Sequence, residues 1–143
     1  MRHEFTVLGR LAGMNEITEA NRRNRYIGAK QKRENQNRVC DAIRASNAPT
    51  FEKPVSGTVL IVRNNRRSDR DNISAGAVKV ILDALQETGV IRKDNWSNCL
   101  EFPCKCVFGK DEKVIVTITD EERVIDRIPY WSQADSDEWR FGN

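Results

Sequence analysis

The sequence predicts an α+β fold, in which a small mixed β-sheet packs against helices within a single domain. Residues 58–63 (TVLIVR) and 113–119 (KVIVTIT) are short, apolar and rich in β-branched side chains, as is typical of buried strands. Between them, an apolar stripe repeats at the i, i+3, i+4 and i+7 spacing of an amphipathic helix. Its members are Val78, Ile81, Leu82 and Leu85.

The remaining elements follow from weaker patterns. Residues 5–11 read as a first strand, and a largely helical basic segment follows, in which Gly28 and the polar run around it argue against one continuous helix. Residues 100–108 indicate a further strand. We expect residues 109–112 to form a hairpin turn that joins this strand to the one at 113–119.

The size and composition describe one globular domain. A chain of 143 residues with 38% hydrophobic and 31% charged residues can bury a core without disulfides or a structural metal. No apolar run approaches the roughly 20 residues that span a bilayer. The first residues also lack the apolar core of a secretory signal. We therefore expect a cytoplasmic protein with no membrane partner.

The charge is distributed unevenly along the chain. Residues 1–119 hold 21 basic and 14 acidic side chains, whereas residues 120–143 hold 3 basic and 7 acidic ones. We divide the chain accordingly into a domain at 1–119 and an acidic, aromatic C-terminal extension at 120–143. A basic body indicates a phosphate-binding surface, and the alternative is a solvated charged face.

The basic helical segment contains most of the candidate DNA-binding side chains. Between Arg22 and Arg44, eight basic residues stand against Glu34 and Asp41. This helix either faces DNA or simply presents a solvated outer face. The candidates for DNA contact in this segment are Arg22, Arg23, Arg25 and Lys30.

The four cysteines do not form a familiar metal-binding pattern. No C-x-x-C pair is present, and the one histidine, His3, is distant in sequence. A cysteine–zinc protein therefore remains a minor alternative. In a reducing cytosol we interpret the cysteines as small apolar side chains.

A cluster of acids around the central helix indicates metal-assisted chemistry. Asp69 and Asp71 are two residues apart, so on an extended segment both carboxylates would project from one side, close enough to share a divalent cation. Asp94 and possibly Asp83 would complete the ligand set. Carboxylates without histidine suit Mg²⁺, with Mn²⁺ as a substitute, in phosphodiester hydrolysis.

Basic side chains near these acids suggest how a phosphate would be held. Lys79 is placed to stabilise charge on the phosphate or on its leaving group. Arg66, Arg67 and Arg70 would bind flanking phosphates. Each acid also has a structural alternative, because Asp71 can cap a helix, Asp83 can pair with Lys79, and Asp94 can occupy a polar turn.

Several motifs resemble the RusA family of Holliday junction resolvases. The central one is D-R-D-N at residues 69–72, followed by Lys79, by D-A-L at 83–85, by G-V-I at 89–91 and by Asp94. The segments G-R-L-A-G-M-N-E at 9–16 and N-R-Y-x-G-A-K at 24–30 are similar to the Gram-positive phage and prophage branch. The resemblance covers roughly residues 4–119.

The resemblance implies a RusA-like fold and a homodimeric, magnesium-dependent endodeoxyribonuclease that makes paired symmetric nicks in four-way DNA junctions during recombination and repair. It implies that Asp69, Asp71 and Asp94 bind the metal, that Lys79 is the catalytic lysine, and that Asp83 matches a recurrent family acid. A two-fold dimer also suits a substrate with two equivalent strands. The alternatives are a nuclease for other branched phage DNA and a non-catalytic nucleic-acid binding module.

Overall fold

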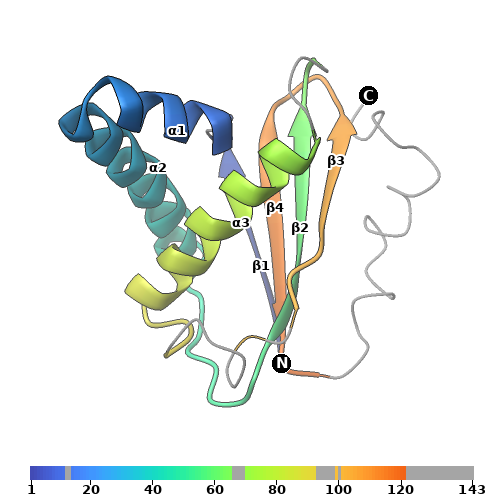
Figure 1. The fold of residues 1–143 in the computed structure, drawn as a ribbon. Helices are drawn as coiled ribbons and strands as arrows, with labels where there is room; N and C mark the ends of the chain where they lie inside the picture. The colour runs from blue at the N-terminus through green and yellow to red at the C-terminus, as the bar shows by residue number, and fades with distance from the viewer. Residues whose placement is uncertain (12–13, 66–69, 93–98, 100, 122–143) are drawn as a thin grey trace.

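The computed structural model describes residues 1–11, 14–65, 70–92, 99 and 101–121, with only the backbone described at residues 14–17 and 70–72. Three helices lie on one face of a four-stranded mixed sheet, which confirms the predicted α+β class (Figure 1). Among the described helices, none combines the length and apolar character needed to cross a lipid bilayer.

The sheet has the strand order β1-β4-β2-β3. Strands β1 (Arg2–Leu8) and β2 (Ser56–Arg63) both pair antiparallel with β4 (Lys113–Thr119). Strand β3 (Cys104–Phe108) pairs parallel with β2. The bounds of β4 match the prediction, whereas β1 begins earlier than residue 5.

The predicted hairpin at residues 109–112 is wrong, because β2 lies between β3 and β4. Helix α3 (Arg70–Glu87) connects β2 to β3, as parallel neighbours require a crossover. The 109–112 connection instead passes across the end of β2. Its first residue, Gly109, donates its N–H to the carbonyl of Arg63 at 2.9 Å, and the carbonyl of Glu112 accepts from the N–H of Gly9, also at 2.9 Å.

The main hydrophobic core lies between the helices and the sheet. Residues on alternate positions of β2 and β4 face the helices, as the period of two in a strand dictates. They pack against the buried stripes of α2 (Arg25–Ala45) and α3. The largest fully buried members are Ile43, Ile81, Leu85, Ile91, Ile118, Val39, Val55, Val59 and Val114.

The helical segment is interrupted within the polar run around Gly28, although α2 runs through Gly28 itself. The break lies at Asn24, which separates α2 from α1 (Met14–Arg23) and caps α2 by accepting the N–H of Tyr26 at 2.8 Å. Gly28 is buried where α1 crosses α2, and an added Cβ would lie 1.9 Å from Oδ1 and 3.1 Å from Cα of Asn21. Glycine is therefore used here for close helix approach.

We expect Gly28→Ala to lower the free energy of unfolding by about 1–2 kcal/mol, although alanine is the better helix former by about 1 kcal/mol. Urea denaturation measures the change. The loss should shrink when Asn21→Ala is added, because the nearest clashing atoms are then removed. At the exposed neighbour Ala29 the order reverses, and Ala29→Gly should cost about 1 kcal/mol. A stabilising Gly28→Ala would contradict the close approach.

Candidate functional site

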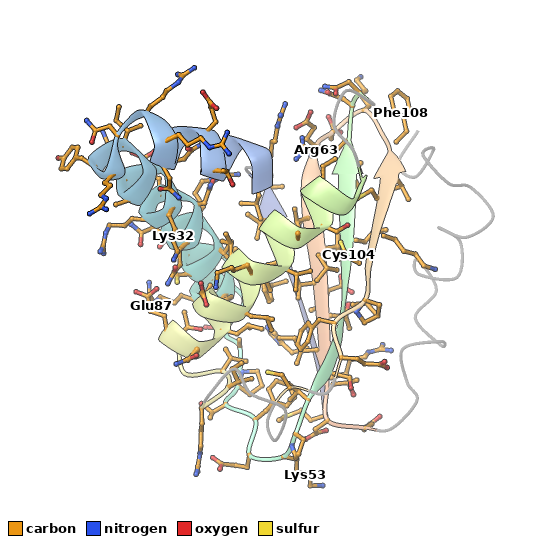
Figure 2. The ribbon with its side chains drawn as sticks, viewed as in Figure 1. Lys32, Lys53, Arg63, Glu87, Cys104 and Phe108 are labelled. Carbon is orange, nitrogen blue, oxygen red and sulfur yellow. The ribbon has the colours of Figure 1, made fainter. Side chains whose placement is uncertain are left out.

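The parallel strands β2 and β3 end side by side, at Arg63 and Phe108 (Figure 2). We call this border of the sheet the strand-end edge. Helix α3 begins near this edge, as Figure 1 shows, and its second turn contacts β3. The contact joins Ser74 Oγ to Cys106 Sγ at 3.7 Å. In open parallel α/β sheets ligands bind beyond the carboxyl ends of the strands, and β2 and β3 form a parallel pair here.

Asp71 lies in the first turn of α3, at the strand-end edge. The prediction of an extended backbone at this residue is wrong. Helix α3 begins at Arg70, one residue before Asp71, and its first buried side chain is Ile73. Asp69 and Asp94 lie outside the described residues. A carboxylate in a first helical turn also interacts favourably with the positive end of the helix dipole.

Lys79 belongs to the same helix as Asp71, about 12 Å further along its axis at about 1.5 Å per residue. Its Nζ lies 3.8 Å from Oδ2 of Asp83, and the two side chains are 59% and 28% exposed. An exposed pair at this spacing stabilises a helix by only about 0.3–0.5 kcal/mol. The Lys79 side chain can therefore leave Asp83 at little cost and lean toward the N-terminus of the helix.

Asp83 cannot complete a metal site that includes Asp71. The two residues share one continuous helix and are separated by about 18 Å along its axis. Carboxylate oxygens bind Mg²⁺ at about 2.1 Å, so one ion cannot contact both. The observed pairing with Lys79 accounts for Asp83, and we remove it from the ligand set.

Two arginines that the sequence did not single out hold the connection after β1. Arg63 is 3% exposed at the end of β2, and its Nη2 donates to the carbonyl of Leu11 at 3.0 Å. Arg38 reaches from α2 and donates to the carbonyls of Leu8 and Arg10 at 2.7 and 2.6 Å. Both side chains therefore position the approach to α1. The only signal of these roles in the sequence was the position of Arg63 at the end of an apolar strand.

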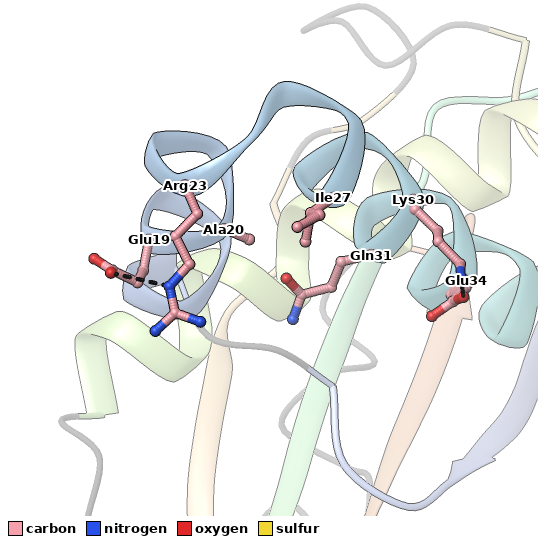
Figure 3. Close-up of a pocket in the computed structure, with 7 residues that line it drawn as sticks. All are labelled: Glu19, Ala20, Arg23, Ile27, Lys30, Gln31 and Glu34. Carbon is pink, nitrogen blue, oxygen red and sulfur yellow. Dashed lines mark ion pairs between the residues drawn. The ribbon is translucent and has the colours of Figure 1, made fainter.

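The basic residues predicted to bind DNA on the helices are all exposed, but their environments differ. Arg23 pairs with Glu19 at 3.5 Å and Lys30 with Glu34 at 4.0 Å, each within its own helix (Figure 3). These pairs border a groove of about 520 Å³ between α1 and α2. Arg22 and Arg25 are exposed at the junction of the two helices. Arg66 and Arg67 lie outside the described residues, as does the side chain of Arg70.

The four cysteines are free thiols, and they line the core rather than a metal site. Within the described parts of the chain, no three His, Cys, Asp or Glu side chains are close enough to hold an ion. Hydrogen bonding to Cys106, together with burial, raises the pKa of the Cys104 thiol. Burial and a hydrogen bond to Glu87 raise the pKa of Cys40 to about 11.

Comparisons with models of known protein families and with curated proteins found no match for this chain. The likeness to the RusA family therefore rests on the motifs quoted above. The function that it implies stays a prediction, to be judged by experiment.

We expect Cys40 to react with Ellman's reagent at pH 8 roughly 100-fold more slowly in the folded protein than in the unfolded chain. The side chain is 1% exposed, and its raised pKa leaves little thiolate at this pH. Because folding raises this pKa, the contribution of the protonated thiol to stability is complete below about pH 8.5 and is lost as the pH rises toward about 11. Cys40→Ala assigns the slow thiol, and rapid labelling of Cys40 without unfolding would contradict its burial.

Proposed function

We propose that this protein is a magnesium-dependent endonuclease that acts on branched DNA, with four-way junctions as its substrate and a homodimer as its working form. The observation that carries the proposal is the position of Asp71. This residue of the D-R-D-N motif stands in the first turn of α3 at the strand-end edge. The exposed basic side chains of α1 and α2 are a second support, because binding of a polyanion depends on cations that neutralise its phosphates.

In this proposal Asp69, Asp71 and Asp94 hold the metal ion. The donor set fits Mg²⁺, which prefers oxygen ligands and retains several waters, and Mn²⁺ would bind the same donors. When bound, the ion neutralises phosphate charge and lowers the pKa of a water molecule. The residues of the chain place the phosphodiester and exclude competing geometries.

Lys79 is the proposed catalytic lysine, which touches the phosphate or its leaving oxygen. Its ammonium group is more than half exposed and weakly held by Asp83, so binding of a phosphate can replace that carboxylate. A phosphate oxygen is a strong hydrogen-bond acceptor for a lysine. In the absence of substrate this lysine pairs with Asp83, which takes no part in the proposed reaction.

A homodimer would give the enzyme two equivalent sites for the two equivalent strands of a junction. Cyclic two-fold assembly is the commonest form of homo-oligomer, and it matches the symmetry of such a substrate. Paired nicks at symmetric positions would follow from this match. The exposed Arg22 and Arg25 would bind phosphates outside the reacting centre.

We expect the wild-type protein to nick four-way junctions symmetrically with Mg²⁺ or Mn²⁺ and to stop when a chelator is added. Asp71→Asn should lower the nicking rate by roughly 1000-fold, equivalent to about 4 kcal/mol of transition-state stabilisation. The same variant should bind the junction as well as or better than wild type, because a repulsive charge is removed. Labelling each strand in turn and resolving the products on denaturing gels measures the cuts.

Asp83→Asn is the matched control, since it removes a carboxylate from the same helix at a distance from Asp71. Its nicking rate should stay within a few-fold of wild type, as loss of a weak ion pair predicts. Intact junctions after incubation of the wild type with Mg²⁺ would refute the proposed activity. Binding without nicking by both wild type and Asp71→Asn would instead favour the binding module. Parallel reactions with forks and flaps identify the preferred branched DNA.

A further inference from the structure

Helix α2 changes character along one stripe of its surface. Positions 25, 29, 32, 36, 39 and 43 repeat at the spacing of three and four residues that keeps side chains on one helix face. In the C-terminal half of the helix this stripe holds the buried Val39 and Ile43. In the N-terminal half it holds Arg25 and Lys32, which are exposed. The N-terminal end of α2 lies away from the sheet in Figure 1.

The polar half of this stripe borders a continuous depression. One hollow of about 410 Å³ is lined by residues of α1 and α2, and an adjoining one of about 280 Å³ extends to the end of α3. Ala29 and Lys32 border both hollows, and we call the two adjoining hollows together the furrow. The furrow is lined by Asn21, Arg25, Gly28, Ala29, Lys32, Arg33, Gln36, Asn37 and Glu87.

The cations of the furrow differ from those of the neighbouring groove in being available. Arg23 and Lys30 each pair with a glutamate of their own helix. Among the residues that the structure describes, Arg25, Lys32 and Arg33 form no ion pair. Arg33 lies near enough to Glu87 to help lower the pKa of that carboxyl, whereas a phosphate that binds Arg25 or Lys32 displaces no carboxylate. Cations without a local partner contribute more to polyanion binding than those already neutralised.

The other side chains of the furrow also suit a phosphodiester backbone. Asn21, Gln36 and Asn37 supply neutral amide groups, which often bind phosphate and sugar oxygens. The exposed Ala29 adds only a methyl group to the lining, whereas Gly28 is buried against Asn21. At the far end, Glu87 accepts hydrogen bonds from Gln36 Nε2 at 2.7 Å and from Cys40 Sγ at 3.3 Å. Its negative charge marks where a bound polyanion would end.

We infer that the furrow along α2 binds the phosphodiester backbone of a nucleic acid through Arg25, Lys32 and Arg33. This inference deepens the proposed function, on which the assignment of the bound strand to an arm of branched DNA rests. The end of α3 lies about 25 Å along the helix from its first turn. The furrow therefore contacts DNA several base pairs from the phosphate that is cut, and it contributes to affinity rather than to chemistry.

A second copy of the chain is a poor occupant for this surface. In a two-fold contact the same patch meets itself, so a furrow rich in cations would face an equally cationic furrow. Like charges brought together across an interface oppose association. Of the two charge types in the furrow, the cations outnumber Glu87. A polyanion is the complementary partner.

The test is equilibrium binding of a fluorescently labelled four-way junction to the full chain in EDTA, where no cleavage occurs. We expect the double variant Lys32→Gln/Arg33→Gln to raise Kd by roughly 10- to 100-fold near 0.1 M salt. The slope of log Kd against log salt, measured between about 50 and about 200 mM, should fall by about 1.8, at about 0.9 per lost phosphate contact. Single-turnover nicking at saturating protein should keep its wild-type rate.

The control is Arg2→Gln/Lys53→Gln, which removes the same charge from two exposed positions. Arg2 pairs with Thr119 at the end of the sheet opposite the strand-end edge, where Lys53 also lies in Figure 2. The control should leave the salt slope unchanged. Circular dichroism and thermal unfolding verify that both double variants fold. An unchanged slope in Lys32→Gln/Arg33→Gln, or an equal loss in the control, would overturn the inference. The inference would also be overturned if Lys32→Gln/Arg33→Gln bound DNA as tightly as wild type but sedimented as a monomer where the wild type is a dimer. That result would indicate that the furrow is a subunit contact.

These outcomes separate the furrow from the nuclease. Furrow-dependent binding in EDTA without nicking in Mg²⁺ would support the furrow and refute the proposed activity. Nicking in Mg²⁺, together with DNA binding that is unchanged in Lys32→Gln/Arg33→Gln, would support the proposed activity and refute the furrow. Absence of any DNA binding by the wild type would refute both.

Discussion

The burial of β2 on both faces is the constraint that organises this molecule. Every residue from 57 to 63 is buried, so the strand requires paired neighbours on each side and cover above and below. Its parallel neighbour β3 can be reached only through a crossover, which is α3. After β2 the chain must therefore run from the strand-end edge back to the opposite edge, where β3 begins. Helix α3 makes this return, and Asp71 lies in its first turn.

The basic side chains of the helical segment carry the same charge, but they have three different kinds of environment. Arg38 is tied to backbone carbonyls, whereas Arg23 and Lys30 pair with glutamates one turn away. Lys32 and Arg33 make neither kind of contact among the described residues. Net charge alone would have treated all of these alike. The tertiary structure decides which cations remain free to meet a polyanion.

The sequence predicted the elements whose patterns are set by burial, and it failed where long-range pairing decided the outcome. Strand β4 and the helix at α3 were recognised because short β-branched runs and helical periodicity report on burial. The predicted stripe of α3 was right only in part, since Ile81 and Leu85 are buried whereas Val78 and Leu82 are partly buried. The hairpin at 109–112 was mistaken because nothing local reveals that β2 is inserted between two consecutive strands. Gly28 argued against a continuous helix, but it lies inside α2. The reason for a glycine there is close contact with α1, which a local sequence pattern does not reveal. The motif singled out Asp71 but did not predict its helical backbone. Asp83 was excluded as a metal ligand only by its distance from Asp71 along the same helix.

The pairing of β1 with β4 has a consequence for synthesis of the protein. The earliest strand bonds to the latest described one, at a sequence separation of more than one hundred residues. A nascent chain therefore cannot complete its sheet until β4 has left the ribosome. Until then Phe5 and Val7 have no strand to join, and the incomplete chain exposes apolar surface of the kind that chaperones recognise.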